Sequence, residues 1–171
     1  MTRTWLPIRE EPDLQVPLYK QSDASQFIAL LEDMKKKNPE MRFAYEYDEE
    51  AEQSGSEQEL ARVVVQTPQM KRNYELYHDT VFMDATYATN PYRMALVVLS
   101  GINNEGKNCI LGYALLKRET LESYTWLLTH ISRFNHPGEP GGGPNVLLTD
   151  FDPSMAGAIE RVLPRTTHLL C

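Results

Sequence analysis

The spacing of apolar residues predicts a helix and then a strand in the first third of the chain. Four residues three or four positions apart indicate the helix, namely Phe27, Leu30, Leu31 and Met34. Its expected cap is Ser22 or Asp23, and Asn38-Pro39 should end it. Aromatic residues alternate with other residues over 41–47, which is typical of a strand with Phe43, Tyr45 and Tyr47 on one face.

The same pattern predicts a longer series of elements from residue 81 onward. Short apolar runs typical of buried strands occur at 81–87, 94–99, 109–116 and 145–150, and another strand begins near residue 166. The turn residues at 103–106 make an antiparallel hairpin of the second and third runs. Helical spacing follows over 124–134, where Thr120 is the expected cap, and over 155–163.

The resulting order, β-β-β-α-β-α-β, predicts an α/β fold with a mixed sheet. Three antiparallel strands come first, and each later helix can cross over to a parallel strand. This is the ribonuclease-H-like plan, here expected to be truncated at its C-terminus before the last helix. We divide the chain into an extended or disordered lead-in (1–20), an acidic helix–strand segment (21–60) and the incomplete main domain (61–171). Whether residues 1–60 belong to the main fold or form a separate module stays open.

Composition narrows the class of protein. With 171 residues, of which 42% are hydrophobic and 24% charged, the chain is long enough for one globular domain. We expect no secretion and no membrane anchoring, because there is neither an apolar h-region nor an apolar run of about 20 residues. Two cysteines, Cys109 and Cys171, cannot form a disulfide scaffold, which fits a reducing compartment.

Charge is unevenly distributed along the chain. The net charge is −7, and residues 1–60 hold 14 acids and 7 bases whereas residues 61–171 hold 10 of each. We therefore expect no binding of nucleic acid through bulk electrostatics alone. The acidic stretch 48–59 is interpreted as a solvated linker.

Two aspartates stand out as candidate chemistry. Asp84 lies inside the first core strand, and Asp150 ends the fourth. If these strands are neighbours, both carboxylates face a common point and can hold Mg²⁺, which prefers oxygen ligands. Taken singly, each acid also fits a structural role in a turn. Asp152 is followed by Pro153, so helix capping explains it fully and Asp150 is preferred as a metal ligand.

Other candidates carry weaker patterns. His168 and Cys171 are spaced as the start of a zinc site, but two ligands do not complete one. No partner spacing accompanies the remaining histidines, His78, His130 and His136. The run Lys35-Lys36-Lys37 is interpreted as the solvated C-terminus of a helix, in preference to a nuclear localisation patch.

Several blocks, in order, resemble the MULE (Mutator-like element) transposases, a family that includes the far-red-impaired-response regulators of plants. The resemblance covers about residues 60–171, and the lead-in at 25–47 is similar to the family's upstream region. The blocks are Phe82-Met83-Asp84-Ala85-Thr86-Tyr87-Ala88-Thr89-Asn90-Pro91-Tyr92, Gly101-Ile102-Asn103, Gly112-Tyr113-Ala114-Leu115-Leu116, Glu119-Thr120 with Glu122-Ser123-Tyr124 and Trp126, Leu148-Thr149-Asp150-Phe151-Asp152, and Val162-Leu163-Pro164 with His168 and Cys171.

The resemblance implies a DDE-type transposase catalytic domain. Asp84 then matches the first acid and Asp150 the second, both as catalytic residues and as ligands of a two-metal Mg²⁺ or Mn²⁺ site. Cys171 matches the cysteine of a Cys-x-x-His motif whose histidine would lie beyond residue 171. Together with the nearby His168, Cys171 is interpreted as a zinc-motif remnant. The third acid, a glutamate on a later helix, has no counterpart, and neither have the family's upstream and downstream zinc modules.

The implied activity is cleavage and strand transfer of DNA in the nucleus by the full-length protein. Its partners would be the transposon ends, the target DNA and a second copy of the chain, with no membrane and no small-molecule substrate. Because the third ligand is missing, we expect the isolated chain to be nearly inactive. The alternatives are a domesticated, DNA-associated regulator without catalysis and an inactive truncated relic.

Overall fold

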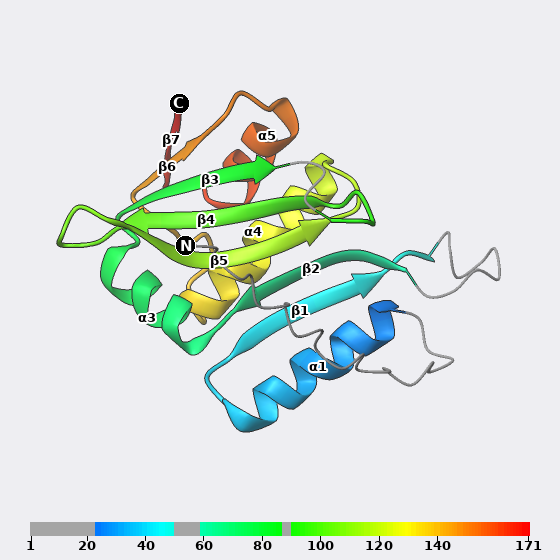
Figure 1. The fold of residues 1–171 in the computed structure, drawn as a ribbon. Coiled ribbons are helices and arrows are strands. Elements are labelled where there is room, and N and C mark those ends of the chain that lie inside the picture. Colours follow the sequence, from blue (N-terminus) through cyan, green and yellow to red (C-terminus); the bar gives the residue numbers. More distant parts are fainter. Residues whose placement is uncertain (1–22, 50–58, 87–89) are drawn as a thin grey trace, which may run out of the picture.

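The computed structural model describes residues 23–49, 59–86 and 90–171, which form a mixed α/β structure around one seven-stranded sheet (Figure 1). The expected lead-in 1–20 and the cap candidate Ser22 lie outside these residues. The helices are α1 (Asp23–Lys37), α3 (Pro68–Tyr77), α4 (Leu121–Asn135) and α5 (Pro153–Val162). The strands are β1 (Arg42–Tyr47), β2 (Leu60–Gln66), β3 (Thr80–Thr86), β4 (Ala95–Ile102), β5 (Asn108–Leu116), β6 (Val146–Thr149) and β7 (Thr167–Leu170). Within the described ranges no helix is both long and apolar enough to span a bilayer.

The strand order is β1-β2-β5-β4-β3-β6-β7. β3, β4 and β5 pair antiparallel, as the three apolar runs predict, and Gly106 in the β4–β5 turn has a φ of 74° that favours glycine. β6 pairs parallel with β3, and β7 pairs parallel with β6. The expected crossovers through α4 and α5 are therefore confirmed.

Two elements between the predicted parts were not anticipated, the strand β2 and the helix α3. β2 pairs antiparallel with both β1 and β5, so one continuous sheet extends from β1 to β7. Half of the residues in α3 are polar or charged, and Tyr74 is its one buried residue. The sequence of this helix therefore shows little of the apolar spacing that predicts an amphipathic helix. The signal that was available is its start: the Thr67 hydroxyl accepts from the Met70 amide (3.3 Å), and Pro68 occupies the first turn.

Helices pack on both faces of the sheet, in a way that follows from side-chain alternation along the strands. On β2, Val64 belongs to the core beneath α4 and α5, whereas Val63 and Val65 belong to a second cluster with α1. The predicted apolar face of α1 is partly wrong. Leu31 is buried together with Ile28, but Leu30 is 55% exposed. The buried residues of α1 are Ile28 and Leu31, and the expected Phe27 packs against the same cluster beside β1 and β2.

The predicted solvated linker is also partly wrong, because its first residue is buried. Asp48 is 4% exposed, and its Oδ2 lies 2.8 Å from Lys117 Nζ. The same ammonium group lies 2.6 Å from Glu59 Oε2, and the Asp48 hydrogen bond is the main cause of the raised pKa of Lys117. This ion pair joins the ends of β1, β2 and β5. Residues 50–58 of the linker lie outside the described residues.

The start of α5 confirms the interpretation of Asp152 as a helix cap. Its Oδ1 accepts from the Met155 backbone N–H at 2.8 Å, and Pro153 occupies the first turn. A proline there loses nothing, because the first amides of a helix have no acceptor within it.

We expect Asp152→Ala to lower the free energy of unfolding by about 1 kcal/mol, because it removes this capping hydrogen bond. Asp152→Asn keeps an acceptor oxygen and should retain most of that stability. Urea unfolding of the three chains measures both values. Equal loss in the two variants would contradict a capping role.

At the end of the sheet where β3 begins, three aromatic side chains form a compact cluster. The buried Tyr74 hydroxyl lies 3.4 Å from His136 Nε2, and His78 stacks on the Tyr74 ring and donates from Nδ1 to the Tyr74 carbonyl at 2.8 Å. The rings of His78 and His136 are 5.6 Å apart. His136 Nδ1 faces Glu139 Oε2 at 3.7 Å. The cluster connects α3 to the loop after α4.

We expect the free energy of unfolding to fall as the pH decreases through the range in which histidine titrates. Burial, followed by the charge of a protonated His78, lowers the pKa of His136. The unfolded chain therefore binds protons more readily at this site than the folded chain does. The contribution of His136 to stability is complete above the pKa of histidine in the unfolded chain, about 6.5, and is lost as the pH falls below that value towards the lower pKa of the folded chain.

Urea unfolding at a series of pH values tests this, with His136→Gln as the variant that cannot ionise. The slope of stability against pH should be smaller in the variant than in the unsubstituted chain. A residual slope from His130 is expected, because burial lowers the pKa of that imidazole too. Identical slopes in the two chains would be the contrary result.

Candidate functional site

The two candidate aspartates lie on neighbouring strands. β3 and β6 are parallel, and the last pair in their register is Met83 with Thr149. Asp84 directly follows Met83, and Asp150 directly follows Thr149. Adjacent strands are about 4.8 Å apart, so the two residues are direct neighbours at the carboxyl ends of β3 and β6. The expectation that the first and fourth core strands lie side by side is confirmed.

Both carboxylates face away from the core, which corrects the expectation that burial of their strands makes their charge costly. Val81, Met83, Leu147 and Thr149 are buried under α4 and α5, whereas the alternate positions Asp84 and Asp150 are exposed. In the described part of the chain neither carboxylate takes part in a hydrogen bond or an ion pair. The pair is thus solvated, like-charged and open to a cation.

The carboxylate pair has the chemistry of a site for a hard divalent cation. Two ionised oxygen donors on adjacent rigid strands suit Mg²⁺ or Mn²⁺, which take carboxylate and water ligands. Asp152 is engaged by the Met155 amide, so it is not a competing ligand. Among residues 23–49, 59–86 and 90–171, no group of three histidine, cysteine or acidic side chains is arranged to hold a metal. Any further ligands of such a cation would be water or groups outside these residues.

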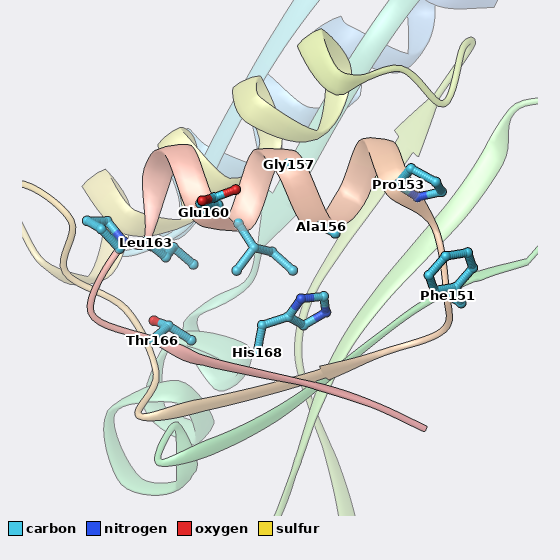
Figure 2. Close-up of a pocket in the computed structure, with 10 residues that line it drawn as sticks. Phe151, Pro153, Ala156, Gly157, Glu160, Leu163, Thr166 and His168 are labelled. Atoms are coloured by element: carbon cyan, nitrogen blue, oxygen red, sulfur yellow. The ribbon is translucent and has the colours of Figure 1, made fainter.

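His168 and Cys171, considered as a zinc-motif remnant, occupy different environments. His168 is half-buried on β7 and its Nε2 is 2.8 Å from Thr149 Oγ1. Cys171 is an exposed free thiol whose backbone N–H donates to the Thr149 carbonyl at 3.0 Å. Figure 2 shows His168 between β7 and α5, in a groove of about 920 Å³ whose lining includes Phe151, Ile159 and Leu163.

Of the remaining sequence candidates, His130 and the lysine run at the end of α1 make contacts typical of structural residues. His130 lies between Trp126 and Phe134 on one face of α4, with ring centroids 4.5 and 5.9 Å away. Trp126 packs against the core, and the Arg62 guanidinium lies over its ring at 5.5 Å. Lys37 pairs with Asp33 within α1 at 2.6 Å.

Thr149 is the residue near the site that sequence reasoning missed. It is 1% exposed, yet its hydroxyl makes two hydrogen bonds, one to the Asp150 carbonyl (2.9 Å) and one to His168. The available signal was its position. A hydroxyl residue stands at an inward-facing place of the apolar run 146–149, and a buried polar group there requires partners.

Known proteins resemble this chain over the region that contains both aspartates. A family described as the MULE transposase domain matches residues 80–171, just over half of the chain, from the start of β3 onward. The chain is 39% identical over 99 residues to FAR1-RELATED SEQUENCE 10 of Arabidopsis thaliana, covering 58% of this chain and 14% of that protein. It is 29% identical over 145 residues to FAR1-RELATED SEQUENCE 11 of the same plant, covering 85% of this chain and 20% of that protein.

A third Arabidopsis thaliana protein, FAR-RED IMPAIRED RESPONSE 1, is 27% identical over 166 residues, covering 91% of this chain and 19% of that protein. The chain thus spans a fifth or less of the length of these curated relatives. The similarity to FAR1-RELATED SEQUENCE 11 and to FAR-RED IMPAIRED RESPONSE 1 extends over β1 and β2 as well as the matched domain, since it includes 85% and 91% of the chain. On the strength of the match over residues 80–171, the chain belongs to the MULE transposase domain family.

Proposed function

We propose that this chain supplies the first two carboxylates of a DDE-type catalytic site, in a protein that cleaves DNA and transfers the cut strand. The observation that carries the proposal is the adjacency of Asp84 and Asp150 at the carboxyl ends of two parallel strands. Catalytic groups are often placed at this edge of a sheet, because strand ends position them rigidly while the loops beyond remain accessible.

The strand order supports a ribonuclease-H-like fold for the proposed domain. β5, β4 and β3 form the antiparallel trio, and β6 and β7 join it in parallel on the side of β3. α4 and α5 make the two crossovers, and both pack against the same core. In this arrangement the strand that carries the first acid is central, with the strand that carries the second acid beside it.

The proposed cofactor is Mg²⁺ or Mn²⁺, held by the Asp84 and Asp150 carboxylates. Bound there, such ions lower the pKa of a water or a 3′-hydroxyl and stabilise the leaving oxygen of a phosphodiester. The contribution of this chain is to hold two negative charges on adjacent strands, and among the described residues neither carboxylate forms an ion pair with a cationic side chain. That arrangement costs electrostatic repulsion in the absence of a cation and so favours binding of one.

The proposed partner is DNA, as transposon ends and target, and the proposed compartment is the nucleus. A second copy of the chain is a further proposed partner. With a net charge of −7, DNA affinity would come mainly from regions of the larger protein outside the carboxylate pair.

A second candidate is a DNA-associated regulator that has kept this domain without catalysis. It is favoured by the name of one relative, FAR-RED IMPAIRED RESPONSE 1, which refers to a response and not to transposition. The two candidates differ in whether a divalent cation is needed at Asp84 and Asp150, since a regulator can use the fold as a binding module alone.

We expect the chain to bind Mn²⁺ through the two carboxylates, and Asp84→Asn or Asp150→Asn to weaken this binding by roughly 10-fold or more. Electron paramagnetic resonance of free Mn²⁺ during a titration measures the affinity. Asp152→Asn is the matched control, because it makes the same charge change two residues from Asp150 at a carboxylate that caps α5.

Equal weakening by all three substitutions would indicate general charge screening and contradict the proposed site. Absence of Mn²⁺ binding by the unsubstituted chain would favour the regulator.

In a plasmid nicking assay with Mn²⁺, the isolated chain should be nearly inactive, because a site with two of three acids lacks much of the transition-state stabilisation. Rapid nicking abolished by Asp84→Asn would overturn that expectation.

A further inference from the structure

The side chain of the buried Thr149 forms two hydrogen bonds next to Asp150. Thr149 Oγ1 is 2.9 Å from the Asp150 carbonyl oxygen and 2.8 Å from His168 Nε2. Thr149 itself is 1% exposed, so water does not compete for its hydroxyl. These hydrogen bonds therefore connect His168 on β7, through Thr149 on β6, to the carbonyl group of Asp150.

The direction of each hydrogen bond follows from the number of protons available. The Thr149 hydroxyl has one proton, and the Asp150 carbonyl can only accept, so Thr149 donates to it. Thr149 Oγ1 must then accept from His168, which requires the proton of a neutral imidazole to be on Nε2. If Nδ1 carries a proton as well, the Nε2–H group is still present and still donates to Thr149.

The backbone around Thr149 is held on the β7 side as well. The Cys171 N–H donates to the Thr149 carbonyl at 3.0 Å, and His168 pairs in register with Leu147. His168 lies in the groove between β7 and α5, which Ile159 and Leu163 also line (Figure 2). Its backbone is thus held in the β6–β7 register while its Nε2 reaches Thr149.

The two candidate carboxylates differ in how their backbones are supported. Asp84 lies within β3, paired with Val98 of β4, and is ordered by the sheet. Asp150 comes after β6 has ended, so it has no partner in the registers of β6 with β3 and β7. Its carbonyl is instead held by the Thr149 hydroxyl. That hydrogen bond fixes the orientation of the peptide that follows Asp150, and its loss would loosen the backbone that carries the carboxylate beside Asp84.

We infer that His168 and Thr149 are positioning residues that hold Asp150 beside Asp84. The inference rests on the proposed function, in which the two carboxylates share a cation. Neither positioning residue would contact the cation or the DNA. They act as outer-shell groups do at metal sites, where loss of such a hydrogen bond commonly costs 10-fold or more in affinity.

Two matched pairs of variants test the inference by Mn²⁺ titration. Thr149→Val removes the hydroxyl with little change in shape, and Thr149→Ser keeps it. His168→Leu removes the donor, and His168→Gln keeps an N–H at similar reach. We expect Thr149→Val and His168→Leu to weaken Mn²⁺ binding by roughly 10-fold, and Thr149→Ser and His168→Gln to restore most of the affinity. Circular dichroism and thermal unfolding confirm that each variant is folded.

Nitrogen-15 NMR of His168 provides a readout that needs no metal. We expect the Nε2-protonated tautomer in the unsubstituted chain and in Thr149→Ser, with a change in the His168 nitrogen shifts in Thr149→Val. The Asp150 carbonyl carbon shift should also move in Thr149→Val and not in Thr149→Ser. A neutral His168 whose only ring proton is on Nδ1 would overturn the inference.

The titration separates failure of the inference from failure of the proposed function. If the unsubstituted chain binds Mn²⁺ through Asp84 and Asp150 but all four variants bind it equally well, the positioning role is wrong and the proposed function stands. If the unsubstituted chain binds no Mn²⁺, the proposed function is wrong and positioning for a cation fails with it.

Discussion

The parallel pairing of β3 with β6 is the constraint on which the rest of the structure depends. The two strands are far apart in the sequence, so closing the intervening chain costs conformational entropy. Burial of Val81, Met83 and Leu147 under α4 and α5 offsets that cost. At the start of the pair, the Val146 N–H donates to the Asp79 carbonyl at 2.9 Å, which fixes the register. The position of Asp150 relative to Asp84 follows from that register.

The same pairing separates the chemistry from the packing. Because neighbouring residues of a strand face opposite sides, the buried Met83 and Thr149 are followed directly by the exposed Asp84 and Asp150. The sheet can therefore keep a dry core on one side and two like charges in water on the other. Thr149 is the exception, a buried polar residue whose hydroxyl connects the core side to the backbone of Asp150.

The N-terminal strands extend the sheet on the side away from the carboxylates. Arg62 on β2 lies 2.6 Å from Glu46 of β1 and 2.8 Å from Glu122 of α4, and its guanidinium covers the Trp126 ring. With the ion pair between the buried Asp48 and Lys117, this network attaches β1 and β2 to the region that matches the transposase family. Arg118 also lies 3.7 Å from Asp48, and Glu59 lies 2.6 Å from Lys117, so each member of the pair has a second partner of opposite charge.

The sequence alone determined the strands from β3 to β7, the crossover helices and the two aspartates, because local periodicity, caps and turn residues specify these elements. It also identified Asp152 as a cap, since Asp-Pro before an apolar helix is a local signal. Only the tertiary structure revealed β2 and α3, the burial of Asp48 and the bonding of Thr149 to His168. β2, the burial of Asp48 and the Thr149–His168 hydrogen bond depend on partners distant in the sequence, which no local pattern specifies. α3 carries a local start signal in Thr67-Pro68, but it has too little apolar periodicity to be identified as a helix. Likewise, adjacency of Asp84 and Asp150 was conditional on strand order until the β3–β6 register was known.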